Sequence, residues 1–332
     1  METFIVQKYT RLQRLHSRLR NALPAYWRRL TVEQVGHLSY VWPNCCPDRN
    51  RFKPAEIIPM TDIIIEPNQR ENQYWIELWR YRELFQVLAW RDLSVRYKQT
   101  VIGAAWALLR PIMTVLVFTI VFGRIARLPS DGTTPYALMV FAGSLPWTFF
   151  STALSEASNS IISNANLISK VYFPRLMVPI ATIAVALVDF LIGFLMLLVV
   201  MAWYQMLPSA RIALLPIFIV LAFVTSMGPA LWIAALNVKY RDFRYITPFI
   251  VQFGLYISPV GFSSSVVPEK WRLLFSLNPI VGVIDGFRWC ILGNGSSLYL
   301  PGLALSTAVA LFFLWFGIRK FRSTERAFAD LI

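Results

Sequence analysis

Residues 164–179 read Asn-Ala-Asn-Leu-Ile-Ser-Lys-Val-Tyr-Phe-Pro-Arg-Leu-Met-Val-Pro, and this polar segment stands between two long apolar runs. It carries the cations Lys170 and Arg175 together with the amides of Asn164 and Asn166. Such groups are costly to place in hydrocarbon, so the polar segment is expected to lie in water. Its two cations favour the cytoplasmic side of a membrane. We interpret it as a docking element for a cytoplasmic partner.

The composition of the whole chain supports a membrane protein. Of its 332 residues, 56% are apolar and 15% are aromatic, whereas soluble domains are only about 45–50% apolar. The long uncharged runs then indicate a polytopic, all-α membrane protein. The formal net charge of +14 is explained by Lys and Arg in cytoplasmic loops. Nucleic-acid binding is disfavoured because no basic stripe accompanies a recognisable binding motif.

Six apolar segments are expected to form transmembrane helices, each near the ~20 residues needed to cross a bilayer. They are 101–123, 136–162, 176–204, 212–236, 246–262 and 300–318. The first is interrupted by Arg110-Pro111, where proline permits a kink. The fifth is short and could begin at Phe243.

The stretch 263–297 is apolar in part but is broken by Asn278-Pro279, Asp285 and Arg288. A true span rarely tolerates such residues at mid-depth. We expect one or two short re-entrant helices at the outer face, and a seventh span is the alternative.

The N-terminal residues 1–59 differ from the rest of the chain. They hold ten Lys and Arg against four Asp and Glu, without an apolar run long enough to span a membrane. Because the sequence from Met60 reads like a natural start, we expect an upstream extension; a basic arm on the membrane surface is the alternative. The other expected parts are a cytoplasmic segment with an interfacial helix (60–99), the transmembrane domain (100–322) and a cytoplasmic tail (323–332).

The interfacial helix is expected within residues 74–98, which are rich in tryptophan, tyrosine and arginine. One helix face follows the i, i+3, i+4, i+7 spacing and carries Tyr81, Leu84, Phe85 and Leu88. A second aromatic stripe consists of Trp79, Trp90 and Tyr97. Such a helix lies in the headgroup plane; a packed soluble helix is the alternative.

The distribution of charge predicts the orientation. With six spans and both termini inside, 16 of the 22 Lys and Arg residues from Met60 onward fall on the cytoplasmic side. The inverse orientation reverses this ratio, so both termini are expected in the cytoplasm.

An enzyme active site is not visible in the sequence. Glycine is never followed by lysine, which excludes a Gly-x-x-x-x-Gly-Lys-Ser/Thr phosphate loop. From Met60 onward there is no histidine and one cysteine, which argues against a His/Cys metal site.

The acids Glu156, Asp189 and Asp285 are widely separated in the sequence. Asp189 could be an ion relay, but a carboxylate hydrogen-bonded within the bundle is favoured, because no intramembrane Lys, His or second acid accompanies it.

A second loop, 237–245, reads Asn-Val-Lys-Tyr-Arg-Asp-Phe-Arg-Tyr. Like the polar segment, it mixes cations with aromatic residues, a composition suited to docking on another protein. A loop that only obeys the positive-inside rule needs the cations but not the aromatic residues.

Five stretches resemble a known family in their order along the chain. They are Arg-Asp-Leu-Ser-Val-Arg-Tyr-Lys-Gln-Thr-Val-Ile-Gly-Ala-Ala-Trp-Ala-Leu-Leu-Arg-Pro (91–111), Phe-Ala-Gly-Ser-Leu-Pro-Trp (141–147), Asn-Leu-Ile-Ser-Lys-Val-Tyr-Phe-Pro-Arg (166–175), Asn-Val-Lys-Tyr-Arg-Asp-Phe (237–243) and Ser-Leu-Asn-Pro (276–279). Over residues 75–325 the chain is similar to ABC-2-type polysaccharide export permeases, most of all to exporters of O-antigen and teichoic acid. No such resemblance covers 1–59.

The resemblance implies a homodimer in the bacterial inner membrane, paired with two copies of a separate ATPase. The ATPase would bind ATP and magnesium, this chain would bind no cofactor, and a lipid-linked glycan, as in lipopolysaccharide biosynthesis, would move outward.

The resemblance also implies roles for individual residues. Contacts with the ATPase would be made by Asn166, Leu167, Lys170, Tyr172, Phe173, Arg175, Tyr240, Arg241, Asp242 and Phe243. Candidate channel-lining residues are Phe141, Trp147, Phe149, Phe150 and Tyr256. The outer gate would include Trp271, Asn278, Pro279, Asp285 and Arg288. For each aromatic residue, packing against lipid is the alternative role.

Two other classes of function remain open at this point. A secondary transporter would use Asp189 as its relay and would follow an ion gradient without a nucleotide-binding partner. A membrane glycosyltransferase or acyltransferase would need clustered acids or a histidine at the interface, which residues 60–332 do not show.

Overall fold

The computed structural model describes residues 71–98, 103–127, 129, 134–240, 242–293, 298–325 and 328. All regular secondary structure in these residues is helical. The elements are α2 (Glu71–Arg80), α3 (Arg82–Lys98), α4 (Gly103–Phe118), the π-helix η3 (Thr119–Ile125), α5 (Tyr136–Ser163), α6 (Ala165–Ile168), α7 (Met177–Trp203), η4 (Ala210–Leu214), α8 (Leu215–Lys239), α9 (Phe243–Ile257), η5 (Ser264–Val266), α10 (Glu269–Phe275), α11 (Pro279–Leu292) and α12 (Leu300–Glu325). The predicted extension 1–59 lies outside the described residues.

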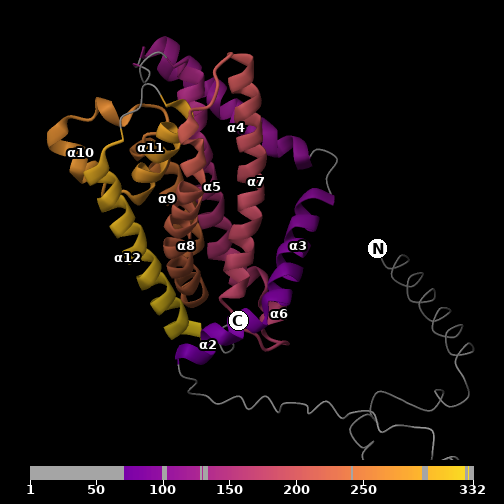
Figure 1. Ribbon diagram of the computed structural model, residues 1–332. Helices are drawn as coiled ribbons and strands as arrows, with labels where there is room; N and C mark the ends of the chain where they lie inside the picture. Colours follow the sequence, from indigo (N-terminus) through magenta and orange to yellow (C-terminus); the bar gives the residue numbers. More distant parts are fainter. Residues whose placement is uncertain are drawn as a thin grey trace, which may run out of the picture. The chain divides into compact units, whose positions relative to one another are not determined.

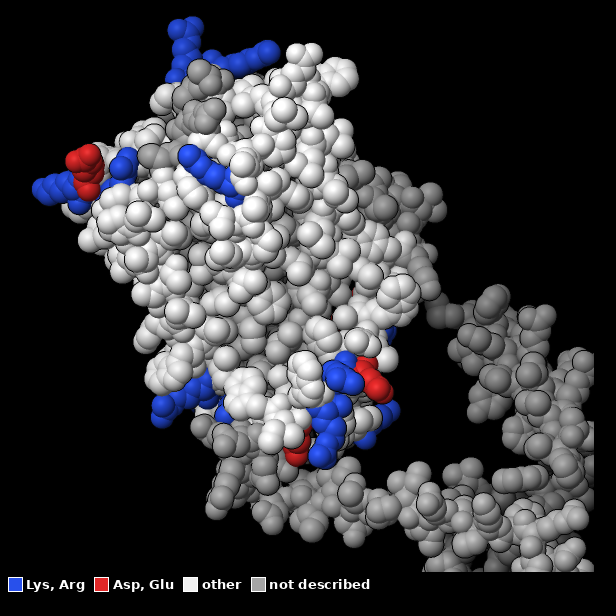
Figure 2. Space-filling model, viewed as in Figure 1, with Lys and Arg blue, Asp and Glu red and all other residues white. Residues whose placement is uncertain are grey.

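Four helices in the described part of the chain are long and apolar enough to cross a membrane. They are α5, α7, α8 together with η4, and α12, and they run side by side in Figure 1. These helices confirm the second, third, fourth and sixth predicted spans. On the face shown in Figure 2, charged side chains gather toward the two ends and a wide uncharged band lies between them. The middle of the bundle thus has an uncharged surface, and the charged side chains lie near the ends of the helices.

The first and fifth predicted spans form shorter helices. Pro111 lies inside α4, and the apolar helix that begins at Pro111 ends at Ile125, too short to count as a span. The helix α9 has 15 residues and is therefore only about 22 Å long, less than the ~30 Å of hydrocarbon. Proline and the polar ends of these segments shorten the apolar helix that can form.

The predicted re-entrant stretch forms two helices rather than one. The axes of α10 and α11 are bent by 110° at a short break. Asn278 causes this break: it accepts a hydrogen bond from the Ile280 backbone N–H at 3.4 Å, and Pro279 occupies the first turn of α11, where its missing N–H is not needed.

The helix α5 forms the centre of the bundle, in contact with α7, α8, α11, α4 and α9. The other extensive contact joins α8 and α12. Two glycines allow it, because a Cβ atom added at Gly317 would lie 2.2 Å from the carbonyl oxygen of Gly228. Small residues let helix backbones approach closely, which favours packing inside a membrane.

The predicted interfacial segment forms two helices, α2 and α3, separated by a turn at Tyr81. The apolar face with Leu84, Phe85 and Leu88 packs against the core, as the spacing indicates. Trp79 and Trp90 are exposed. Tyr97, the third residue of the predicted aromatic stripe, differs from these tryptophans. It is partly buried, and its hydroxyl donates a hydrogen bond to Asp189 on α7.

Candidate functional site

The polar segment connects α5 to α7 at one end of the bundle, here called the polar-segment end. Asn164 ends α5, and its side chain donates to the Ser160 carbonyl at 2.9 Å. The one-turn helix α6 follows, and residues 169–176 make no further helix. Asparagine favours such helix ends because its side chain satisfies local backbone groups. The chain between α5 and α7 therefore forms a short loop with several polar residues.

The predicted contact residues of the polar segment divide into two groups. Asn166, Lys170 and Tyr172 are exposed, and half of the Tyr172 surface faces outward. Leu167 packs against the core from the edge, and Phe173 is only 4% exposed. The exposed three are available for a partner, whereas Phe173 anchors the loop to the bundle.

Arg175 joins the polar segment to the far end of the chain. Its backbone N–H donates to the Glu325 carboxylate at 3.0 Å, and its guanidinium donates to the Glu325 carbonyl oxygen. The Tyr74 hydroxyl on α2 donates to the same carboxylate at 3.4 Å, and burial raises the pKa of this phenol, so it stays a donor at neutral pH. No local pattern could have indicated a contact across 150 residues.

The second predicted loop joins α8 to α9 at the same end. Asn237, near the end of α8, is buried and donates to the Ser158 carbonyl of α5 at 2.8 Å, which places this loop beside the polar segment. Tyr240 and Asp242 are exposed and Phe243 is partly buried, with the Tyr240 and Phe243 rings 6.3 Å apart. Arg241 lies outside the described residues.

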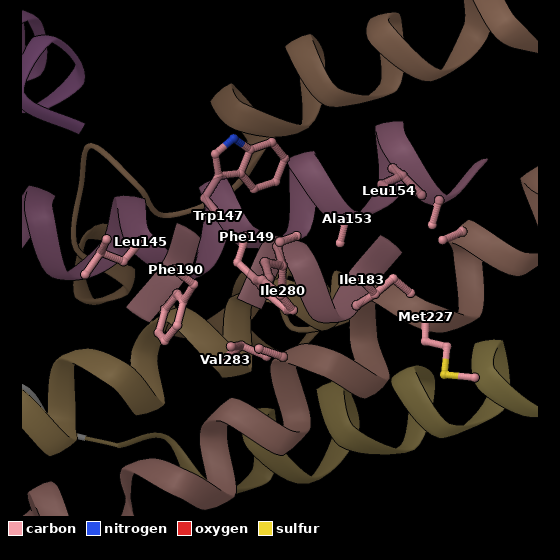
Figure 3. Close-up of a cluster of buried hydrophobic side chains, with 14 of the residues drawn as sticks. Leu145, Trp147, Phe149, Ala153, Leu154, Ile183, Phe190, Met227, Ile280 and Val283 are labelled. Carbon is pink, nitrogen blue, oxygen red and sulfur yellow. The ribbon is translucent and has the colours of Figure 1, made fainter. Parts of the chain in front are cut away.

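The predicted channel aromatics are mostly internal. Phe141, Trp147 and Phe149 are at most 6% exposed, and Figure 3 shows Trp147 and Phe149 within the buried cluster around Phe190. The Phe149 and Phe190 rings pack edge to face at 5.9 Å. Phe150 is half-buried beside Trp147, with ring centroids 5.6 Å apart. Tyr256 differs, because 65% of its surface is exposed on α9.

Arg288, predicted in the outer gate, is a buried structural residue in this chain. It is 1% exposed, and its guanidinium donates to the carbonyl oxygens of Val260 and Phe262 at 2.9 Å and of Met139 at 3.2 Å. Gly143 makes room, because a Cβ atom there would lie 2.6 Å from the guanidinium. A buried charge needs such partners.

The other predicted gate residues lie around the same bend. The Ser264 hydroxyl donates to the Asp285 carboxylate at 2.7 Å, and the Asn278 amide donates to the Ser258 hydroxyl at 3.1 Å. Pro279 begins α11, and Trp271 is exposed on α10. The bend is thus tied to the loop after α9 by side-chain hydrogen bonds.

A charged cluster that the sequence did not reveal joins α3, α5 and α7. The Arg96 guanidinium donates to the carboxylates of Glu156 and Asp189, and the Tyr97 hydroxyl donates to Asp189. Burial, followed by the hydrogen bond to Asp189, raises the pKa of the Tyr97 hydroxyl. The expectation that no second acid accompanies Asp189 is wrong, because Glu156 binds the same guanidinium, whereas the assignment of Asp189 as a hydrogen-bonded carboxylate is confirmed.

Five residues earlier, in the middle of α3, the Arg91 guanidinium donates to the Asn164 side-chain oxygen at 2.6 Å. The helix α3 is therefore attached at two points, to the start of the polar segment and to the middle of α7.

The comparisons with known proteins agree with this architecture. The family model described as ABC-2 type transporter matches residues 83–292. The chain is 26% identical over 258 residues to the O-antigen export system permease protein RfbA of Myxococcus xanthus, which covers 77% of this chain and 98% of that protein. Two proteins of the same name from Klebsiella pneumoniae are 25% and 24% identical, each over 75% of this chain and 95% of their own length.

The matched region begins in α3 and ends with α11, so it includes the polar segment, the second loop and the bent helix pair. Permeases of this family act together with ATPase subunits and bind no cofactor themselves. The match covers more than half of the chain, and the chain therefore belongs to the ABC-2 type transporter family, as a multi-pass transmembrane permease subunit without a catalytic domain.

Proposed function

We propose that this permease exports a lipid-linked polysaccharide of the O-antigen type outward across the bacterial inner membrane. The observation that carries the proposal is the similarity along 95–98% of the length of three relatives whose names state O-antigen export. The permease works as a homodimer with two copies of a cytoplasmic ATPase, which binds ATP and magnesium. Both termini lie in the cytoplasm, since this orientation places most Lys and Arg inside.

The docking surface for the ATPase consists of the exposed residues at the polar-segment end. Asn166, Lys170 and Tyr172 supply it from the polar segment, and Tyr240 and Asp242 from the second loop. Aromatic side chains beside charges are typical of protein interfaces. Because Phe173 and Arg175 fasten the polar segment to the bundle and to Glu325, a push on this surface moves α5, α7 and the end of α12 together.

The path of the glycan passes along α9. This helix exposes Phe249, Phe253 and Tyr256, and the first two rings lie 4.2 Å apart. Their i, i+4, i+7 spacing places them on one helix face. In the homodimer this face borders the path, where aromatic rings stack on sugar faces. Phe141, Trp147 and Phe149 support the wall from within the bundle.

The experiment that tests this function is deletion of the gene in its native host. Surface polysaccharide should disappear while the lipid-linked glycan accumulates inside, and plasmid-borne permease should restore export. Export should also stop when the phosphate-loop lysine of the partner ATPase is replaced. Surface polysaccharide that persists after deletion contradicts the function, and export that follows the proton gradient with an inactive ATPase supports a secondary transporter instead.

A further inference from the structure

A polar cavity of about 730 Å³ opens between α3, α5 and α7. Ligand pockets commonly enclose about 300–1,000 Å³, so the cavity is large enough for a small molecule or a lipid headgroup. Ten of its twelve lining residues are polar or charged, and the two apolar ones are Val95 and Val185. The polar atoms of this lining need a polar partner, because hydrocarbon offers them no hydrogen bonds, while most of the surface that faces the cavity is apolar and suits the carbon atoms of a lipid.

The hydrogen-bond donors of the lining are largely directed into the protein. Three side chains donate to backbone carbonyls of their own helices at 2.8–3.0 Å: Asn159 to Ser155, Ser160 to Ala157 and Thr182 to Val178. A hydroxyl or amide that donates in this way still offers oxygen lone pairs. The lining therefore favours a ligand that brings donors.

The charged side chains of the cavity lining occur in pairs of opposite sign. Arg91 and Asp92 form an ion pair at 2.7 Å at its edge, and Arg96 binds the carboxylates of Glu156 and Asp189. The lining itself therefore holds two cations, Arg91 and Arg96, and two carboxylates, Asp92 and Glu156, while Asp189 lies outside the lining. A neutral lining with paired charges suits a zwitterionic group better than a pyrophosphate or another strong anion.

The position of the cavity along α5 corresponds to lipid headgroups. With 28 residues, α5 is about 42 Å long, which matches a bilayer including its headgroups at about 40–45 Å. The cavity follows α5 from Ser155 to Asn164, the last ~13 Å before the polar segment. This depth includes the headgroup layer and the first carbons of the acyl chains.

We propose that the cavity binds the headgroup of an aminophospholipid, with its primary ammonium against Asp92 and Glu156 and its phosphate at Arg91. A zwitterion matches the cavity because acidic and basic side chains lie side by side at its edge. Val95 is 55% exposed on the same helix and provides apolar contact for an acyl chain. The bound lipid bridges α3 and α5 between the two attachment points of α3.

Lipid retention by the complete permease–ATPase complex tests this site. The complex is reconstituted in nanodiscs that contain phosphatidylglycerol together with phosphatidylethanolamine, its N,N-dimethyl form or phosphatidylcholine. Phosphatidylcholine has the same net charge but no N–H donor. After gentle extraction, native mass spectrometry measures the lipid that stays bound. A charge-assisted hydrogen bond is worth about tenfold or more in binding, so phosphatidylethanolamine should be retained about tenfold over phosphatidylcholine, with the dimethyl form between them.

Two variants locate the bound lipid. Asp92→Asn removes an edge carboxylate, and Ser155→Leu fills part of the cavity; each should abolish the preference for phosphatidylethanolamine. Ser151→Leu, one turn away on α5 and outside the lining, is the matched control and should keep it. Equal retention of the lipids by the unaltered complex overturns the proposal. So does a preference that survives both variants, or retention of lipid-linked glycan in place of phospholipid.

Discussion

The Arg288 guanidinium connects three separate backbone positions near the bent helix pair, at Met139, Val260 and Phe262. Since the charge is almost fully buried, each of its three nitrogens donates to a protein carbonyl oxygen. Arg288 therefore fixes the position of α11 against α5 and against the loop after α9. Any motion of the bent pair that breaks these bonds must offer the guanidinium other acceptors.

We expect Arg288→Met to destabilise the permease strongly. The substitution leaves the three carbonyl oxygens without this donor, and an unsatisfied buried group costs about 1–3 kcal/mol. A total of about 3 kcal/mol or more should lower the apparent melting temperature of the purified complex by roughly 5–10 °C. Lys270→Met, at an exposed cation of α10, is the control. Equal melting temperatures for both variants would show that Arg288 is not a structural residue.

Tyr172 is the best residue of the polar segment for testing the docking of the ATPase. It is half exposed, so its substitution should not disturb the core, whereas Phe173 is buried. Tyr172→Ala should reduce export and the stimulation of ATP hydrolysis by about tenfold, as expected for loss of an interface hot spot worth more than about 1 kcal/mol. The melting temperature of the permease alone should stay unchanged. Leu207→Ala, at a fully exposed position of the α7–α8 connection, should leave both activities intact.

At the scale of the elements, α3 is attached to the bundle by both apolar and polar contacts. One of its faces packs on the core through Leu84, Phe85 and Leu88. Its C-terminal half is held by polar bonds, from Arg91 to Asn164 and from Arg96 to Glu156 and Asp189. Because Asn164 begins the polar segment, a movement of that segment is transmitted directly to α3. The hydrogen bond from Arg91 to Asn164 thus couples α3 to the proposed docking surface.

Arg96→Gln should loosen α3. It leaves two partly buried carboxylates side by side, and we expect a loss of about 1–2 kcal/mol, because the three side chains are partly exposed. Limited proteolysis should cut within α3 faster than in the unaltered protein. The triple variant with Glu156→Gln and Asp189→Asn should regain much of the protection. Arg82→Gln, at an exposed position of α3, is the control; equal cleavage rates for the two single variants would refute the attachment.

At the scale of the whole molecule, α5 organises the bundle and both predicted docking loops meet at one end of it. The hydrogen bond from Asn237 to the Ser158 carbonyl brings the ends of α8 and α5 together, and Glu325 brings the end of α12 to Arg175. A partner that binds at this end therefore contacts parts of the chain that are connected to four helices.

The proposed orientation can be measured by cysteine labelling. In a background without the three native cysteines, a membrane-impermeant maleimide should label Leu207→Cys in intact spheroplasts. It should label Lys170→Cys only after permeabilisation, because the proposed orientation places the polar segment in the cytoplasm. Both positions are exposed, so burial does not explain a difference. The reverse pattern of labelling would invert the proposed topology.

The helical membrane class, four of the spans, the break at Asn278-Pro279 and the family could all be predicted from the sequence. These features depend on local properties: the length of apolar runs, the helix-breaking chemistry of Asn-Pro, and motifs that are contiguous in the chain. The exposed residues of the polar segment, Lys170 and Tyr172, were also predictable, because polar residues between apolar runs must reach water.

Only the tertiary structure decided the roles of individual long-range partners. Arg175 meets Glu325 across 150 residues, Arg96 meets Asp189 across 93, and Arg288 meets Met139 across 149. Such pairs leave no periodic signal, because their distance depends on how the helices pack and not on the spacing along one helix. For the same reason, burial of Phe141 and Phe149 in the core was not readable from the sequence, since an apolar residue in a membrane helix can face lipid, a partner or the interior of its own chain at similar cost. Burial of Phe173, in the loop of the polar segment, likewise depends on how that loop packs against the bundle.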